Sequence, residues 1–165
     1  MSDIAALFHR LTHGVYVIGV ADGERRDAFT AAWVMQASFD PLLLALSINP
    51  DNASYPILRS GQTFTVNVLK RDQLELARRL GTRSGRDEDK LAGLAWRPGR
   101  RGAPVLGDAL AWLECELQSS VPAGDHELVV GRVTDGAIQA AEAEPMSYAD
   151  TGAMDGSAAL YPEHF

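Results

Sequence analysis

The feature that most constrains the fold is a series of short β-type segments with no long helix between them. β-branched and aromatic residues fill 15–20, and the Asp22-Gly23 pair after them is a strong hairpin signal. Further segments of this kind occupy 26–38, 42–48, 64–69, 110–120 and 128–133. Because strands of a parallel sheet need crossover connections, usually helices, this order predicts a mainly β fold, an antiparallel barrel with a few short flanking helices.

Short helices are expected beside these strands. Apolar residues at helical spacing predict an amphipathic helix over 3–12, a brief helix begins at 54–55, and a third spans 72–81. The stretch from there to Pro104 is expected to be mostly loop, and the tail from Pro145 to be irregular. Neither region shows a sustained hydrophobic period.

The segment 110–120 has the clearest period of two, because Leu113, Cys115 and Leu117 alternate with Trp112, Glu114 and Glu116. This alternation is typical of a half-buried strand with Cys115 on its apolar face, where the thiol is expected to be inert. As the single cysteine, Cys115 excludes an internal disulfide. The four histidines show no metal-ligand spacing with it, so no metal site is expected.

Length and charge limit the classes of partner. The 165 residues suit one compact domain, and a net charge of −7 argues against nucleic acid or an anionic membrane as a partner. Eight of the 15 basic residues nevertheless fall within 78–101, which suggests one local site for a small anion. No segment resembles a signal peptide or a membrane span, so we expect a cytoplasmic protein.

Small and polar residues gather where one strand-like segment ends. A backbone free to approach a planar ligand and to bond its ring edge is offered by Thr30, Ala31, Ala32 and Trp33. The alternative reading of these residues is a tightly packed strand. Gln36 and Ser38 follow, either to orient polar groups of a ligand or as ordinary polar residues at a strand end.

Polar groups at two turns suggest recognition of a nucleotide. Asn52 and Ser54 lie at a helix start, where free N–H groups favour a phosphate, although simple capping is the alternative. Lys90 and Arg86 offer charge to neutralise that phosphate, or they belong to a solvated loop. His126, on a turn before an apolar strand, either projects an imidazole at the barrel rim or has no role.

Together these segments resemble the flavin reductase-like family of FMN-binding split barrels, which includes flavoredoxin-type proteins and the small reductase components of two-component flavin monooxygenases. The resemblance runs from about Phe8 to Tyr148 and rests on the order and spacing of 14–18, 29–41, 64–69, 89–90, 124–126 and 130–133. It implies a single domain over 1–165 with a split-barrel core at about 8–148 and a tail at about 149–165. It also implies a homodimer with flavin near the subunit interface.

The resemblance further implies a role for particular residues. The segment 30–38 would line the isoalloxazine ring, and the ribityl chain and phosphate would follow 47–54, including Ser47, Asn49, Asn52 and Ser54, with help from Lys90. His126 would lie beside the face where nicotinamide stacks, and Tyr148 near that pocket. The chain departs from the family in having Leu42 in place of a second proline, and Ala-Asp-Thr-Gly-Ala-Met after Tyr148.

The implied cofactor is FMN, with FAD as an alternative, and the implied electron donor is NADH or NADPH. Such a cofactor carries the redox chemistry itself, which agrees with a sequence that has no nucleophile or metal motif. Hydride would pass from nicotinamide C4 to flavin N5 between rings stacked about 3 to 3.5 Å apart. Trp33 would wall the flavin, and His126 would position the nicotinamide nucleotide.

Three hypotheses follow. The first is an NAD(P)H:flavin oxidoreductase that delivers reduced flavin or electrons to a monooxygenase or electron-transfer partner. The second is an FMN-binding electron carrier that a partner protein reduces and that has no nicotinamide site of its own. The third is a split-barrel binding module without flavin.

Overall fold

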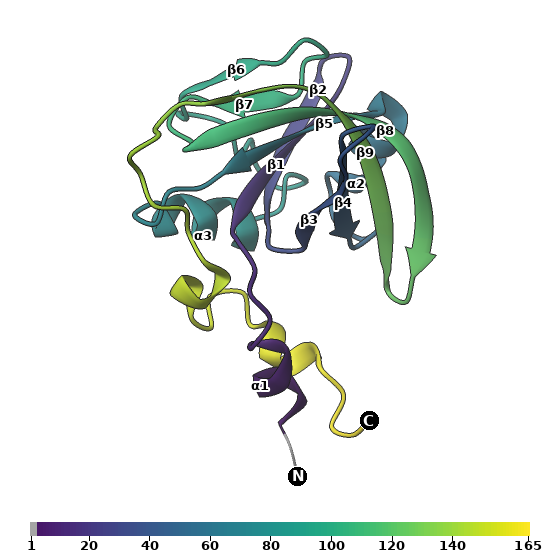
Figure 1. Cartoon of the computed structure of the whole chain (residues 1–165), viewed down its shortest axis with the longest axis vertical. Coiled ribbons are helices and arrows are strands. Elements are labelled where there is room, and N and C mark those ends of the chain that lie inside the picture. The colour runs from purple at the N-terminus through teal and green to yellow at the C-terminus, as the bar shows by residue number, and fades with distance from the viewer. Residues whose placement is uncertain (1–2) are drawn as a thin grey trace.

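The strand-like segments form one seven-stranded sheet in the computed structural model, which describes residues 3–165 (Figure 1). Every pairing is antiparallel, which confirms a mainly β fold with few helices. The sheet order is β2-β1-β5-β8-β9-β4-β3, formed by β1 (Tyr16–Asp22), β2 (Arg25–Ala31), β3 (Val34–Ser38), β4 (Leu43–Ile48), β5 (Thr63–Val68), β8 (Ala111–Ala123) and β9 (His126–Ile138). Because β2 and β3 are its two edges, closure into a barrel stays a prediction.

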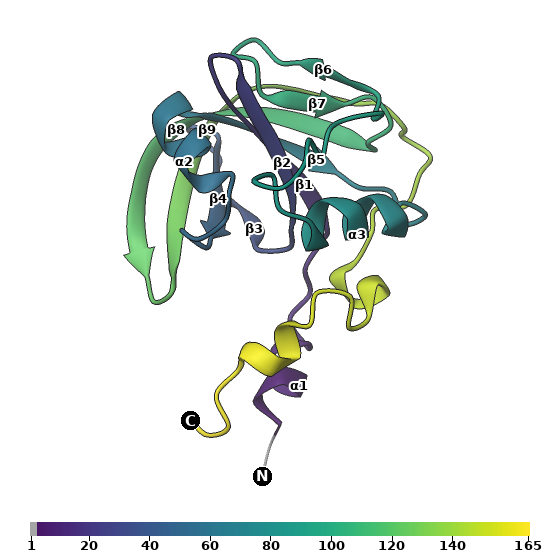
Figure 2. The ribbon, with the colours of Figure 1, turned by 180° about the vertical axis from the view of Figure 1, so that it is seen from behind.

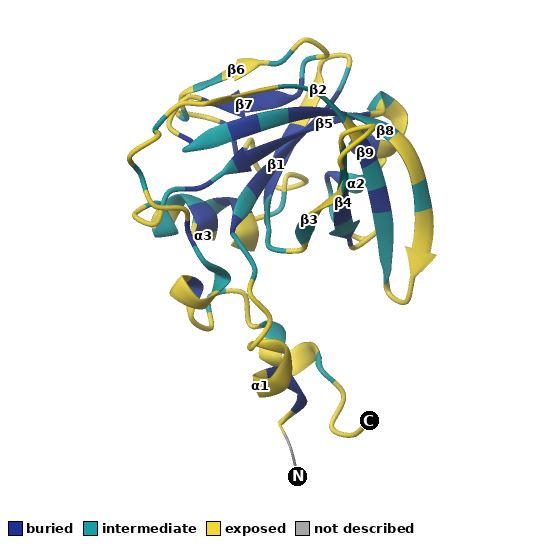
Figure 3. Cartoon of the chain, viewed as in Figure 1, coloured by how far each residue is buried: buried dark blue, intermediate teal, exposed yellow. Residues whose placement is uncertain are grey.

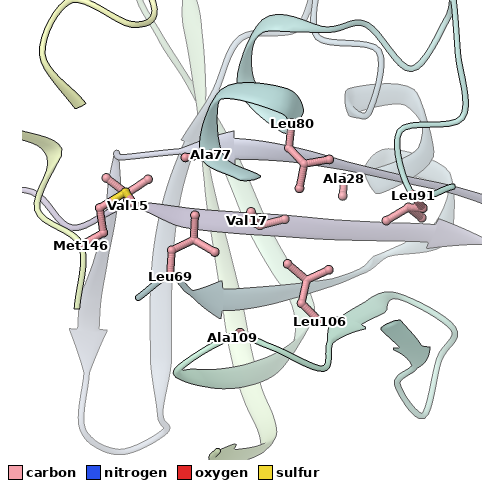
Figure 4. Packing of buried hydrophobic residues seen from close by; sticks show 10 residues of the cluster. All are labelled: Val15, Val17, Ala28, Leu69, Ala77, Leu80, Leu91, Leu106, Ala109 and Met146. Atoms are coloured by element: carbon pink, nitrogen blue, oxygen red, sulfur yellow. The ribbon is translucent and has the colours of Figure 1, made fainter. Parts of the chain in front are cut away.

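The unbroken apolar run of β1 reflects burial on both of its faces. Val17 packs into a cluster beneath α3 (Leu74–Thr82), whose members Figure 4 shows converging from several strands and loops. The next residue, Ile18, points to the opposite face and belongs to a second buried cluster, which includes Phe64 and Leu46. A strand covered on both sides cannot alternate apolar and polar residues, so every position between Val17 and Ala21 is buried.

The single strand predicted over 26–38 is wrong, because the chain leaves one edge of the sheet and joins the other. β2 pairs with β1 and ends at Ala31, whereas β3 pairs with β4 and begins at Val34. At the crossing, the carbonyl of Trp33 accepts a hydrogen bond from the N–H of Ser47, at 3.0 Å. The backbone between the two edge strands is therefore outside any ladder.

The loop predicted before residue 104 contains a small second sheet, β6 (Trp96–Pro98) and β7 (Pro104–Leu106), which the sequence interpretation missed. The strand predicted over 110–120 exists, but the prediction that its polar side faces solvent is wrong at Glu114. Glu114 is only 2 % exposed, and its carboxylate accepts hydrogen bonds from the backbone N–H groups of Arg100 and Arg101, both at 3.1 Å. The face expected to meet solvent is thus covered at this point.

The remaining elements are short helices: α1 (Ile4–Phe8), α2 (Tyr55–Gly61) and the 3-10 turns η1 (Tyr148–Thr151) and η2 (Ser157–Leu160). Both views show α1 and the last turn of the chain lying together below the sheet, as one projecting arm (Figures 1 and 2). Most of this arm is exposed (Figure 3). Within 3–165, no helix combines the length and apolar character needed to cross a membrane.

Candidate functional site

A pocket of about 550 Å³, here called the main pocket, lies between the sheet and the arm. One side, the strand wall, comes from the crossing between β2 and β3, the end of β4 and the start of β9, with Phe29, Thr30, Ala31, Ala32, Trp33, Ser47, Ile48, Asn49, Asn52 and His126. The other side, the terminal wall, comes from the two ends of the chain, with Phe8, His9, Leu11, His13, Tyr148, Asp155, Ser157, Leu160 and Tyr161. A volume of this order suits a small organic ligand.

The crossing leaves backbone donors available in the strand wall. Among residues 3–165, no backbone carbonyl or side chain accepts a hydrogen bond from the N–H of Ala32 or of Trp33. Both residues line the main pocket. Because these backbone donors are not used within the described chain and face the pocket, the pair suits the acceptor atoms of a ligand's edge. This fit depends on the backbone rather than on the two side chains.

Trp33 and His126 form an aromatic corner in the main pocket. Their ring centroids lie 4.8 Å apart with the planes inclined at 49°. The Nδ1 atom of His126 lies 2.7 Å from a carboxylate oxygen of Asp125, and this hydrogen bond lowers the pKa of Asp125. A carboxylate at Nδ1 favours the tautomer with its proton there, which leaves Nε2 of the neutral ring as an acceptor.

The asparagines after β4 use their side chains within the chain. The Oδ1 atom of Asn49 accepts from the N–H of Asp51, and that of Asn52 accepts from the N–H of Ser54, each at 2.9 Å. These bonds shape the turn that leads into α2 and leave the amide groups of Asn49 and Asn52 at the edge of the main pocket. Ser47 and Asn49 lie in the same lining, as their predicted role requires.

A second pocket of about 320 Å³ adjoins the main pocket, since Phe29, Thr30 and Asn52 line both. It contains the side chains of Arg83 and Arg86, and we call it the arginine recess. By contrast, Asp155 is the only residue with a permanent charge in the described lining of the main pocket. The two connected spaces therefore suit a ligand with an uncharged ring at one end and a phosphate at the other.

Lys90 and Ser54 belong to a buried cluster instead of the main pocket. The ammonium of Lys90 lies 3.7 Å from a carboxylate oxygen of Asp27 and donates to the carbonyl of Leu80 at 3.3 Å. The hydroxyl of Ser54 donates to the other oxygen of Asp27 at 2.7 Å. Burial lowers the pKa of Lys90, although Asp27 opposes that shift. Contact of either side chain with a phosphate stays a prediction, and in this structure both are engaged with Asp27.

Gln36 and Ser38 lie farther along β3 and do not line the main pocket. Gln36 is exposed and pairs with Leu44 at the sheet edge. Their predicted contact with a ligand therefore has no support from this pocket. The other predicted residues do come together there: Thr30, Ala31, Ala32, Trp33, Ser47, Asn49, Asn52, His126 and Tyr148.

Most of the terminal wall is absent from the sequence prediction. Tyr148 was predicted, but its neighbours there are His9, stacked on it with ring centroids 5.7 Å apart, and Asp155 and Ser157, both bonded to its hydroxyl. No local pattern joins His9 to Asp155, because they lie at opposite ends of the chain. One local pattern in the sequence could have indicated the turn η1: Ser147 forms a capping box with Asp150 at its start.

Cys115 is fully buried, as expected, and burial raises its pKa to about 12. A thiol in this state is protonated at neutral pH and is a poor nucleophile. Across residues 3–165, no group of three or more potential metal ligands comes together.

Comparison with known proteins identifies the family and similar folds. The flavin reductase like domain matches residues 8–157. A solved structure of the NADH:FAD oxidoreductase SgcE6 from Streptomyces globisporus C-1027 is 28% identical, with a TM-score of 0.81 over 88% of this chain and 86% of that one. The FMN-binding protein from Thermus thermophilus, solved with bound 1-cyclohex-2-enone, is 31% identical, with a TM-score of 0.76 over 81% and 75% of the two chains.

Similar proteins with other names are longer. The high molecular weight rubredoxin of Moorella thermoacetica is 40% identical over 149 residues, which are 89% of this chain and 64% of that protein. A putative diflavin flavoprotein of Nostoc sp. is 36% identical over 86% of this chain but only 25% of its own length. The matched domain thus occurs as part of longer proteins. On the match over 8–157, the chain belongs to the flavin reductase like family.

Proposed function

We propose that this chain is an NAD(P)H-dependent flavin oxidoreductase with a split-barrel fold. The observation that carries the proposal is the pair of connected spaces: the main pocket, whose strand wall is uncharged and has free backbone donors at Ala32 and Trp33, and the arginine recess that opens from it. A flavin mononucleotide has this polarity, with a planar ring at one end and a phosphate at the other. The similar NADH:FAD oxidoreductase supports the choice of reaction.

The residues present would hold a flavin with its ring in the main pocket and its phosphate in the arginine recess. The N–H groups of Ala32 and Trp33 would hold the polar edge of the ring, Ser47 and Asn49 would follow the ribityl chain, and Arg83 and Arg86 would receive the phosphate. Lys90 also lines the recess, where its ammonium is paired with Asp27. A flavin held by these residues would supply the redox chemistry as the hydride acceptor.

His126 is proposed to place the nicotinamide nucleotide. Its ring lies against Trp33, and Asp125 fixes its orientation through Nδ1. The neutral ring offers Nε2 as an acceptor for the carboxamide N–H group, whereas the protonated ring would donate to a phosphate. The terminal wall opposite would limit the space for the second ring.

The test is the absorbance of the purified protein with FMN or FAD added, before and after anaerobic addition of NADH or NADPH. We expect flavin to bind and its absorbance near 450 nm, a general property of oxidised flavins, to bleach with at least one nucleotide. A His126→Ala variant should bind flavin normally and bleach more slowly. Protein that takes up neither flavin would contradict the proposal and support the alternative of a binding module without flavin.

A second candidate function is an FMN-binding electron carrier that a partner protein reduces. The observation in its favour is that the similar rubredoxin and diflavin flavoprotein are longer proteins, so this domain works in them beside other parts of the same chain. Flavin that binds but stays oxidised with NADH and NADPH, and bleaches with dithionite, would select this candidate.

We also propose that the chain forms a homodimer and supplies a monooxygenase or another electron acceptor. Support for association comes from β3 and the turn after it, where an unpaired sheet edge carries exposed Met35, Phe39 and Leu42. Exposed apolar residues at an edge strand favour contact with a second chain. Analytical ultracentrifugation distinguishes a dimer from a monomer, and a Phe39→Glu variant should shift the protein toward the monomer.

A further inference from the structure

The terminal wall presents a hydrogen-bonded cluster of three side chains to the main pocket. The hydroxyl of Tyr148 lies 2.8 Å from Oδ2 of Asp155 and 2.9 Å from Oγ of Ser157. The backbone N–H of Ser157 donates to Oδ1 of Asp155 at 2.9 Å. His9 stacks on the tyrosine ring, and His13 meets it edge-on with centroids 6.4 Å apart. Both ends of the chain therefore fix the cluster in place.

The hydroxyl protons of Tyr148 and Ser157 are both donated within the cluster. An ionised carboxylate only accepts hydrogen bonds, and a tyrosine hydroxyl has one proton to give. Because the bond to a charged acceptor is the stronger one, that proton goes to Asp155, and Ser157 donates its own to the oxygen of Tyr148. Toward a ligand, the three side chains then offer lone pairs and one negative charge.

The carboxylate of Asp155 keeps its charge at neutral pH. Burial acts to raise the pKa of Asp155, yet the hydrogen bonds from Ser157 and Tyr148 hold it below its ordinary value. The described lining of the main pocket contains no lysine or arginine to offset this charge, and Arg10, which follows His9, lines a different pocket. The cluster is therefore an anionic acceptor surface.

We propose that Asp155, Tyr148 and Ser157 form a subsite for the hydrogen-bond donors of a nicotinamide nucleotide, and that the charge of Asp155 makes NADH the preferred donor over NADPH. The donors are the hydroxyls of the adenine-side ribose, the sugar that carries the additional phosphate in NADPH, and they need acceptors of this kind. The additional phosphate of NADPH brings negative charge toward a carboxylate with no neighbouring cation in the lining. This inference rests on the proposed reductase function.

The test is the Asp155→Asn variant, which keeps the size of the side chain and an acceptor oxygen for Tyr148 but removes the charge. We expect wild-type protein to prefer NADH, and the variant to lose about fivefold of that preference through a lower KM for NADPH, a size typical of one partly solvated charge at several ångströms. Calorimetric binding of NAD⁺ and NADP⁺ to the oxidised protein gives a readout without turnover. The ratio of the two dissociation constants should be closer to one in Asp155→Asn than in the wild-type protein.

The matched control is Glu163→Gln, which removes the same charge from the same tail at a residue that lines a different pocket. It should leave the nucleotide ratio and flavin affinity unchanged. The reduced 3-acetylpyridine analogue of NADH keeps the adenine-side ribose but replaces the amide N–H group by a methyl. Tyr148→Phe should weaken binding of NADH and of this analogue equally. A larger loss for NADH would place the subsite at the carboxamide and overturn the proposal.

The failures of the two proposals differ. Flavin that binds but never bleaches with NADH or NADPH, in protein that binds neither nucleotide, overturns the reductase function and the subsite with it. Flavin that bleaches normally while Asp155→Asn keeps the wild-type ratio overturns the subsite alone. Wild-type preference for NADPH also overturns it.

Discussion

The two walls of the main pocket are held in different ways. Behind the strand wall, Leu46, Phe64 and Val129 are fully buried in the sheet. The terminal wall rests on short turns, on contacts such as Phe8 with Tyr161 at 5.2 Å between ring centroids, and on the hydrogen bonds of Tyr148. Since apolar burial supplies most of the stability of a fold, the strand wall should remain folded when the terminal wall loosens. Under the proposals above, the stable strand wall would bind the flavin, and the less stable terminal wall would select the nicotinamide nucleotide.

The largest expected effect breaks the strand wall. Phe64→Ala empties a fully buried site beside Gly131 of β9 and should lower the free energy of unfolding by about 3 to 5 kcal/mol. Leu160→Ala, at an 84 % exposed position of the terminal wall, should change it by less than about 0.5 kcal/mol. Urea unfolding measures both variants. Similar losses in the two would contradict the difference drawn between the walls.

The next effect concerns the ion pair behind the strand wall. Lys90→Met should cost about 3 kcal/mol of unfolding free energy, because it leaves the 7 % exposed carboxylate of Asp27 without its cation. Asp27→Asn together with Lys90→Met should recover much of that loss, and urea unfolding of the single and double variants gives the coupling. Additive losses would show that the two side chains act independently.

The smallest expected effect is a loss of local stability in the terminal wall, but not in the strands, as the pH falls. The pKa of Asp155 is lowered in the folded state, so its contribution is present above the ordinary aspartate pKa and is lost as pH falls through the lower value. Amide hydrogen exchange around η2 should therefore accelerate in acid while the strands stay protected. Asp155→Asn should remove this acid step.

The measurement has to be local because a carboxylate on β9, outside both walls, also has a lowered pKa. Hydrogen bonds from Ser120 and Tyr55 lower the pKa of Glu127 on β9, so global stability also falls in acid. An acid step around η2 that survives in Asp155→Asn would exclude Asp155 as its cause.

The sequence predicts the parts of this molecule that depend on neighbouring residues. The hairpin of β1 and β2 is confirmed, because a β-branched run followed by Asp22 and Gly23 determines it locally, and Gly23 has φ of +60°. The chain crossing at Ala32 is not readable, since neither glycine nor proline marks it. It depends on which edge of a sheet each half joins, and that is decided by contacts far along the chain.

The same distinction holds for the site. The predicted residues from Thr30 to Trp33 lie in one segment, and they reach the main pocket together. Lys90 was predicted from its charge and from the family resemblance, whereas its position is set by Asp27 on β2, and a buried pair of this kind leaves no local pattern. The contact of His9 with Tyr148 joins the two ends of the chain, so no window of sequence contains it.

The meeting of both chain ends at the terminal wall has a consequence for the electron delivery proposed above. A domain joined by a short flexible linker to either end would be tethered beside the main pocket at an effective concentration of about a millimolar, whatever its own affinity for this surface. Delivery would then become an intramolecular event governed by linker length. In the longer similar proteins, the matched domain shares its chain with other segments.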